Sequence, residues 1–257
     1  MLFEGMKRSI VTYTRIPLKM TWDKDKAHTT PVSFLPFIGL LIAVLSSWPL
    51  FIPAFDLSLV ALFMLLTCVL LTGAFHEDGF MDSLDGLIGG TDPKQRLTIM
   101  KDSRLGSYAT IGIWFLLAMK WLLLTKLLSL FDSPYMIILL WSGVHILARM
   151  TPIFIMQKFS YVSVGQSKAK EMIGQLSLSE WVLVFLPMLS LSLITLYGYA
   201  WYLGVFLCVL PALLSWLFGH YFYAKIQGFN GDTLGASEQM SELILLFFFV
   251  MYFSSLS

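Results

Sequence analysis

Long runs of apolar residues dominate this chain and constrain its fold more than any other feature. Of its 257 residues, 57% are hydrophobic and 13% are charged, whereas an ordinary soluble domain has about 45–50% apolar and about 25% charged residues. A helix needs about 20 residues to cross the roughly 30 Å hydrocarbon core of a bilayer. Several runs reach that length. The sequence therefore predicts an all-α, polytopic integral membrane bundle that forms a single domain over residues 1–257.

Seven membrane-spanning helices are predicted from these runs, because long apolar windows indicate that helices exist even where their ends are uncertain. The predicted spans cover residues 34–55, 57–73, 108–130, 135–157, 181–197, 201–223 and 243–253. Long polar connections are expected at residues 74–107, 158–180 and 224–240. Residues 1–30 form an N-terminal segment, and its first part is predicted to lie on the membrane as an amphipathic helix.

The basic residues orient the chain in the membrane. Of the 17 lysines and arginines, 15 lie in the N-terminal segment or in a long connection, or, like Arg149, close to one. The exceptions are Lys120 and Lys126, which are placed near the opposite end of the third predicted span. Basic residues accumulate on the cytoplasmic side of membrane proteins. The N-terminus and the three long connections are therefore predicted to be cytoplasmic. A net charge of +1 and the lack of a basic tail in the sequence give no indication of a nucleic-acid partner.

Three aspartates, Asp78, Asp82 and Asp85, follow the second predicted span at positions i, i+4 and i+7. On a helix they fall within roughly 60° of one another, and like charges on one face repel. A divalent cation would remove the repulsion, and Mg²⁺ prefers oxygen ligands while leaving positions for substrate phosphates. This aspartate stripe predicts a Mg²⁺ site for a diphosphate. The alternative is a solvated acidic loop, which is disfavoured because carboxylates beside a span are costly unless used.

Basic side chains that suit phosphate follow the stripe. Arg96, Lys101 and Arg104 are predicted to bind substrate, since arginine holds phosphate through a planar fork. The alternative is that they only anchor the chain at the membrane surface. Arg149 lies inside a predicted span and must snorkel to the interface or find a partner, such as a phosphate or one of the aspartates.

A last polar cluster surrounds Gly231 and Asp232, in the connection before the final predicted span. Glycines permit a tight turn and the close approach of backbone N–H groups to an anion, so Gly231 is predicted to bind substrate. Asp232 is predicted to reach the aspartate stripe. Glu238 and Glu242 follow one helical turn apart. The alternative is an ordinary loop between two spans.

Together these clusters resemble the cobalamin-5′-phosphate synthase family, also named adenosylcobinamide-GDP ribazoletransferase. The matching stretches are residues 72–86, 99–106 and 231–236, with milder matches at residues 36–39 and Arg149. The first stretch is specific, and the resemblance covers nearly the whole chain. The family's last loop usually reads Gly-Gly-x-Thr-Gly-Asp, whereas Gln227 and Asn230 replace its first Gly and its Thr here. Asparagine keeps a polar group there, so the substitution is expected to adjust the properties of the loop without loss of function.

The resemblance implies a reaction at the membrane. A ribose hydroxyl of α-ribazole or its 5′-phosphate attacks the cobinamide-side phosphorus of adenosylcobinamide-GDP, and GMP leaves. Mg²⁺ is the expected cofactor, with Asp78, Asp82 and Asp85 as its ligands. The expected catalytic residues are His76, Glu77, Asp82 and Asp232, the general base remaining open. The expected location is the cytoplasmic membrane of a bacterium or archaeon, where the protein contacts lipid. A homo-oligomer or a complex with other cobalamin-assembly enzymes also stays open.

Two rival classes fit the sequence less well. CDP-alcohol phosphotransferases share aspartates at helical spacing, but their Asp-Gly-x-x-Ala-Arg pattern fails after Asp78 and Gly79. A transporter or channel needs ionisable groups near the bilayer midplane. Here the acidic residues lie at the ends of the predicted spans, and only Arg149 intrudes.

Overall fold

A computed structural model describes residues 2–19, 30–163, 175–198 and 201–256. Parts of two predicted segments, residues 20–29 and 164–174, lie outside the described residues. The helices in chain order are α1 (Leu2–Tyr13), α2 (Leu35–Ser46), α3 (Leu57–Thr72), α4 (Phe75–Gly89), α5 (Pro93–Ile99), α6 (Ser107–Leu128), α7 (Pro134–Ala148), α8 (Met150–Lys158), α9 (Leu178–Gly198), α10 (Trp201–Ile226) and α11 (Gly231–Ser254), with short 3₁₀ turns η2 (Pro31–Phe34) and η3 (Trp48–Phe51). Within these ranges the one extended pairing is a single bridge between Tyr161 and Phe229. The predicted all-α class is confirmed.

Several helical stretches are long and apolar enough to cross a membrane. Among the described residues these are Pro31–Phe51, Ser107–Leu128, Pro134–Lys158, Leu203–Ile226 and Gly231–Ser254, and α3 with α4 makes a further one if that bent pair counts as one span. The polytopic membrane class is thereby confirmed, and the predicted count of seven and the predicted orientation stay predictions.

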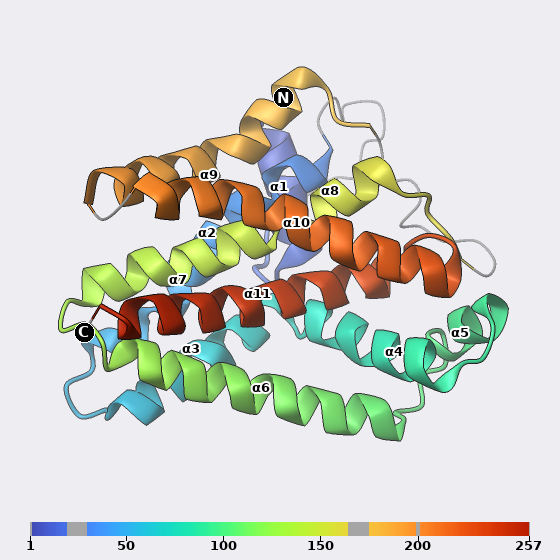
Figure 1. The fold of residues 1–257 in the computed structure, drawn as a ribbon, viewed down its shortest axis with the longest axis horizontal. Coiled ribbons are helices and arrows are strands. Elements are labelled where there is room, and N and C mark those ends of the chain that lie inside the picture. Colours follow the sequence, from blue (N-terminus) through green and yellow to red (C-terminus); the bar gives the residue numbers. More distant parts are fainter. Residues whose placement is uncertain (1, 20–29, 164–174, 199–200, 257) are drawn as a thin grey trace.

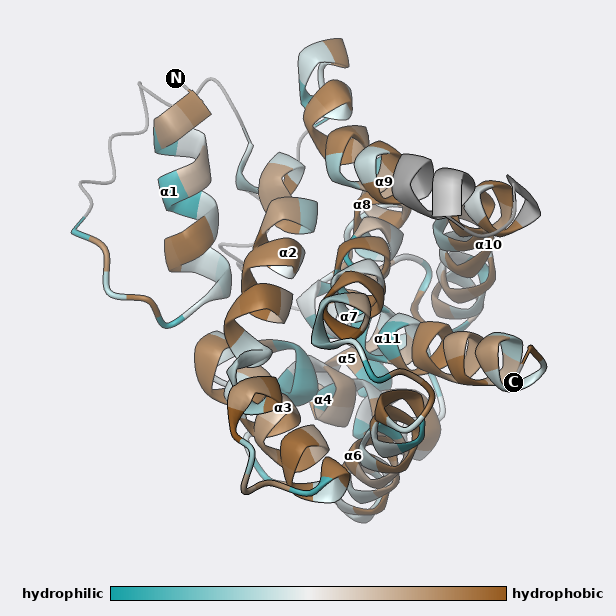
Figure 2. Cartoon of the chain, turned by 90° about the vertical axis from the view of Figure 1, so that its left-hand side faces the viewer, coloured by the Kyte–Doolittle hydropathy of each residue, from teal (hydrophilic) through white to brown (hydrophobic). Residues whose placement is uncertain are grey.

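Helix α11 lies in the middle of the bundle and packs against α4, α6, α7, α8 and α10. Figure 1 shows α6, α7, α10 and α11 running along the long axis of the molecule, with α4 beside the first half of α11. Large apolar side chains such as Trp114 and Leu122 on α6 are 64% and 62% exposed, and Figure 2 shows apolar residues along α6 and α10. These outward faces suit a lipid environment.

A sharp bend separates the apolar helix α3 from the acidic helix α4. Helix α3 begins where the Asp56 carboxylate accepts a hydrogen bond from the Leu59 N–H (2.8 Å). It ends at Gly73 and Ala74, whose φ angles are 66° and 58°. Two successive left-handed residues cannot continue a right-handed helix, and the two helices differ in direction by 88°. The bend takes the aspartates out of the line of the apolar run.

Helix α11 begins earlier than predicted. The Asn230 side chain accepts a hydrogen bond from the Thr233 N–H (2.9 Å), and the Thr233 hydroxyl accepts one from the Asn230 N–H (2.9 Å). This reciprocal capping starts a helix, so α11 covers Gly231–Ser254 and α10 continues to Ile226. Most of the polar connection predicted at residues 224–240 is therefore helix, and it carries acidic residues into the bundle.

Candidate functional site

Glycines allow α4 and α11 to pack closely. A Cβ added to Gly79 would lie 3.0 Å from the carbonyl oxygen of Asp232, and a Cβ added to Gly235 would lie 3.1 Å from the carbonyl oxygen of His76. Any larger residue at these positions would push the backbones apart. The close contact sets the start of α11 beside the aspartate stripe of α4.

The structure brings together aspartates that are far apart in the sequence. The charge of Asp82 interacts with those of Asp232, Asp78 and Asp85, and Asp232 also interacts with Asp78 and with Lys101. Like-charge repulsion makes it costly to ionise these carboxylates. Desolvation adds to that cost, because Asp82 and Asp232 are partly withdrawn from water. The site therefore concentrates negative charge, as the sequence indicated, and Lys101 is a nearby cation.

Asp85 is engaged differently from the other members of the stripe. Its two carboxylate oxygens accept hydrogen bonds from the backbone N–H groups of Gly106 (2.7 Å) and Ala109 (2.9 Å). These N–H groups open the first turn of α6, where no helical carbonyl is available to them. Asp85 thus caps α6 from α4, and the metal role predicted for it would compete with these bonds.

Glu77 offers an oxygen that the protein itself does not satisfy. Its side chain is buried, and its Oε2 has no hydrogen-bond partner among the described residues. Leaving a buried acceptor unpaired costs about 1–3 kcal/mol. Across the described ranges, no three Asp, Glu, His or Cys side chains are grouped so that they could hold a metal ion by themselves. The metal and catalytic assignments stay predictions.

Two of the predicted phosphate-binding arginines have partners within the protein. Arg96 donates hydrogen bonds to the carbonyl oxygens of Gly90 (3.1 Å) and Lys225 (2.8 Å), which ties α5 to the end of α10. Arg104 pairs with Asp102 at 2.5 Å, and its hydrogen bonds lower the pKa of Asp102 to about 2. Lys101, in contrast, is exposed and lies within electrostatic reach of Asp232.

Arg149 is buried in the bundle and does not snorkel. It is 1% exposed. Its Nη2 lies 2.9 Å from Glu238 Oε1, and its Nη1 lies 3.2 Å from Glu242 Oε1. Its partners are thus the two glutamates and His145 (carbonyl oxygen at 3.1 Å), and not one of the aspartates. The sequence left the partner of Arg149 open. Both glutamates were expected at or before the start of the last span, whereas they lie within α11 and inside the bundle.

Lys120 and His145 complete a buried charge network with Arg149, Glu238 and Glu242. The Lys120 ammonium lies 2.6 Å from Glu242 Oε2, and His145 Nδ1 lies 2.8 Å from Glu242 Oε1. Sequence reasoning missed Lys120, which it placed near the opposite membrane surface. The available signal was two glutamates one turn apart ahead of an apolar run, together with a lysine midway along another span.

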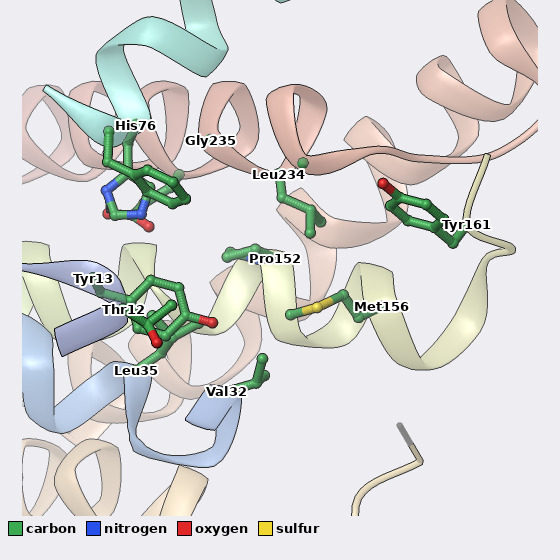
Figure 3. A pocket seen from close by; sticks show the side chains of 13 residues that line it. Thr12, Tyr13, Val32, Leu35, His76, Pro152, Met156, Tyr161, Leu234 and Gly235 are labelled. Atoms are coloured by element: carbon green, nitrogen blue, oxygen red, sulfur yellow. Dashed lines mark ion pairs between the residues drawn. The ribbon is translucent and has the colours of Figure 1, made fainter. Parts of the chain in front are cut away.

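A small cavity opens beside the network at the start of α11. Its volume is about 100 Å³. The lining residues are Thr12, Tyr13, Val32, Leu35, Phe75, His76, Pro152, Met156, Tyr161, Gly231, Leu234, Gly235 and Glu238. Figure 3 shows His76 on one side and Tyr13 on the other. His76 Nδ1 lies 3.0 Å from Glu238 Oε1, and burial and the Glu238 charge raise the pKa of Tyr13. Predicted site residues His76 and Gly231 therefore line this cavity, on a different face of α11 from Asp232.

Comparison with known proteins identifies the family. A family model described as cobalamin-5-phosphate synthase matches residues 5–250. The chain belongs to this family. Members that resemble it include the adenosylcobinamide-GDP ribazoletransferase of Shewanella piezotolerans, which is 36% identical over 90% of this chain and 89% of the relative. The enzyme of that name from Ralstonia pickettii is 32% identical over 98% of this chain and 97% of the relative.

The cobalamin-5-phosphate synthase assignment confirms the family resemblance seen in the sequence, and with it a transferase of cobalamin biosynthesis. A further member, from Vibrio cholerae, is 30% identical over 91% of this chain and 88% of the relative. No solved structure matches the chain. The CDP-alcohol phosphotransferase and transporter alternatives are not favoured by these findings.

Proposed function

We propose that this protein joins the two halves of the cobalamin nucleotide loop at the membrane. In this reaction it transfers the cobinamide phosphate of adenosylcobinamide-GDP to α-ribazole or α-ribazole 5′-phosphate. The family match and the relatives' shared name support adenosylcobinamide-GDP ribazoletransferase activity. The observation that carries the chemistry is the cluster of Asp78, Asp82 and Asp232 at the α4–α11 contact. A concentration of carboxylates suits a cation that binds phosphate.

The reaction is a displacement at phosphorus. A ribose hydroxyl oxygen of ribazole forms a bond to the phosphorus that carries cobinamide, the bond from that phosphorus to the oxygen of GMP breaks, and the hydroxyl proton passes to a base. A bound Mg²⁺ would supply positive charge that offsets the negative charge developing on the phosphate. A pair of carboxylates suffices for such an ion, because Mg²⁺ usually takes its other ligands from phosphates and water.

The residues of the chain then have distinct proposed roles. Two of the three carboxylates Asp78, Asp82 and Asp232 would hold the ion, with phosphate oxygens and water as its other ligands. Lys101 would attract the departing nucleotide, and its electrostatic interaction with Asp232 supports this role. Glu77 and His76 remain the candidate bases, and a base must lie within hydrogen-bond reach of the hydroxyl it deprotonates. The unpaired Oε2 of Glu77 favours that residue.

The proposed location is the cytoplasmic membrane of a bacterium, with the aspartate stripe facing the cytosol, where nucleotides are found. Both the family and the apolar helices support a membrane enzyme, and the positive-inside distribution of lysine and arginine supports the orientation.

Substitution of Asp82 by Ala tests the proposal. Purified protein in lipid nanodiscs, given both substrates and Mg²⁺, is expected to release GMP. Asp82→Ala is expected to abolish release because it removes a ligand at the centre of the acidic cluster, while the variant stays folded in membranes. Asp56→Ala, which alters the cap of α3, is the matched control and is expected to retain activity. Full activity of Asp82→Ala would contradict the site assignment.

Metal removal tests the proposed cofactor independently. Chelation with EDTA is expected to stop GMP release, and added Mg²⁺ is expected to restore it, because the carboxylates would otherwise repel the diphosphate. Undiminished turnover after chelation, with metal content checked by elemental analysis, would rule out the Mg²⁺ assignment.

A further inference from the structure

The buried charge network lies where ionised groups are costly. Lys120, Arg149, Glu238 and Glu242 are 3%, 1%, 1% and 5% exposed. Two cations and two carboxylates balance in charge. A buried ion pair is often no more stabilising than apolar residues of similar volume, and ionisable groups inside membrane bundles usually mark function. Stability alone is therefore a weak reason for this network.

The network fixes the rotation of α11 about its axis and its position along that axis. Glu242 lies between Lys120 of α6 (2.6 Å) and Arg149 at the junction of α7 and α8 (3.2 Å), and Glu238 contacts the other guanidinium nitrogen of Arg149 (2.9 Å). Turning or sliding α11 would break these contacts together. Apolar side chains give little such preference between helices in lipid, because lipid tails are equally apolar.

The orientation of α11 in turn decides where Asp232 lies. The helix is continuous from Gly231 to Ser254, and Glu238 follows Asp232 by six residues, which is about 9 Å along the axis. At that end the backbone of Asp232 already lies against Gly79, where an added Cβ would be 3.0 Å from its carbonyl oxygen. A change at Glu238 therefore reaches the aspartate cluster through one rigid element.

We propose that Arg149 and Lys120 are positioning residues for the aspartate cluster. Through Glu238 and Glu242 they hold α11 in the rotation that places the Asp232 carboxylate opposite Asp78 and Asp82. This role rests on the proposed function and deepens it. It also replaces direct phosphate binding by Arg149, since that guanidinium is enclosed by the two glutamates and the His145 carbonyl oxygen (3.1 Å).

Charge-conserving variants separate positioning from charge balance. Glu238→Asp keeps the carboxylate but withdraws it by one methylene, and Arg149→Lys keeps the charge but loses the planar fork. Glu180→Asp is the matched control. Glu180 is also 5% exposed, and it accepts hydrogen bonds from the N–H groups of Thr30 (2.6 Å) and Ser177 (2.9 Å), neither of which belongs to α4 or α11. Lys120→Arg tests the α6 end if Glu238→Asp does not fold.

Two measurements on the full-length protein in nanodiscs give the readout. Mn²⁺ binding, followed by electron paramagnetic resonance, is expected to weaken by about tenfold in Glu238→Asp and Arg149→Lys, as happens when groups that orient metal ligands are changed. The kcat of GMP release is expected to fall by about tenfold or more, because misplacement by about 1 Å is costly. The KM values for both substrates should change little, and Glu180→Asp should resemble wild type.

A purely structural role predicts a different result. Loss of folded protein lowers the number of Mn²⁺ sites and leaves their affinity unchanged. Wild-type Mn²⁺ affinity and wild-type kcat per folded molecule in both variants would overturn the proposal, as would a raised KM for adenosylcobinamide-GDP at unchanged kcat in Arg149→Lys. A wild-type protein that releases no GMP would contradict the proposed function instead, and the Mn²⁺ comparison would still test positioning.

Discussion

At the scale of single residues, carboxylates one turn apart on α4 serve different ends. Both carboxylate oxygens of Asp85 accept hydrogen bonds from backbone N–H groups at the start of α6. Asp82 instead interacts with the charges of its acidic neighbours. The local sequence does not distinguish the roles of the three aspartates of the stripe. Their roles diverge because α6 returns to α4 and presents its first N–H groups to Asp85 alone.

Asp85→Ala is therefore expected to lower stability. The N–H groups of Gly106 and Ala109 would lose their acceptor, and loss of a helix cap costs about 0.5–2 kcal/mol. Thermal unfolding in detergent should show a lower midpoint, with Asp85→Asn in between because it keeps one acceptor oxygen. An unchanged midpoint together with lost GMP release would mean that Asp85 acts on the metal instead.

At the scale of elements, the contact between α4 and α11 leaves too little room for a side chain at Gly79. Gly79→Ala is expected to reduce GMP release by about tenfold or more, because the added Cβ would meet backbone atoms of Asp232 at 3.0 and 3.1 Å. Backbone cannot yield as a flexible side chain can, so the two helices must separate.

Gly89→Ala is the control for that substitution. Its added Cβ would meet only the ring of Tyr108, at 3.8 Å, and alanine favours a helix over glycine by about 1 kcal/mol. This variant should be fully active and no less stable. If Gly79→Ala behaved in the same way, the close approach of α4 and α11 would not matter for activity.

At the scale of the whole molecule, the predicted orientation places the aspartate stripe in the cytosol. It can be tested with single cysteines in a chain whose Cys68 and Cys208 are replaced by Ala. Thr91→Cys, after α4, is expected to react with a membrane-impermeant maleimide only after permeabilisation. Ser133→Cys, between α6 and α7, is expected to react from outside. The reverse pattern would put the stripe on the outer face.

The sequence predicted the parts of the fold that depend on local pattern. Apolar runs predicted the long helices, and the spacing of Asp78, Asp82 and Asp85 predicted a helical stripe, which α4 provides. Asp232 was expected near the stripe and lies there. In each case the residue types and their spacing along the chain carry the information.

The remainder depends on contacts between distant segments. A capping pair, Asn230 with Thr233, starts α11 well before its apolar run, and the glycines around it had favoured a loop. The charged partner of Lys120 is Glu242, 122 residues away, and its other partner is Gln239 on the same helix as Glu242. No local sequence pattern predicts such a pairing. The distribution of basic residues had placed Lys120 near the membrane surface opposite the cytoplasm.

The buried charge network also constrains the order in which the protein can be assembled. Both of its cations are made earlier, in α6 and where α7 meets α8, and both of its carboxylates are made later, in α11. Before α11 is inserted, Lys120 and Arg149 lie in the membrane without the carboxylates of Glu238 and Glu242. A chain that stops at residue 230 should therefore be degraded soon after synthesis, and supplying α11 as a separate peptide should protect it.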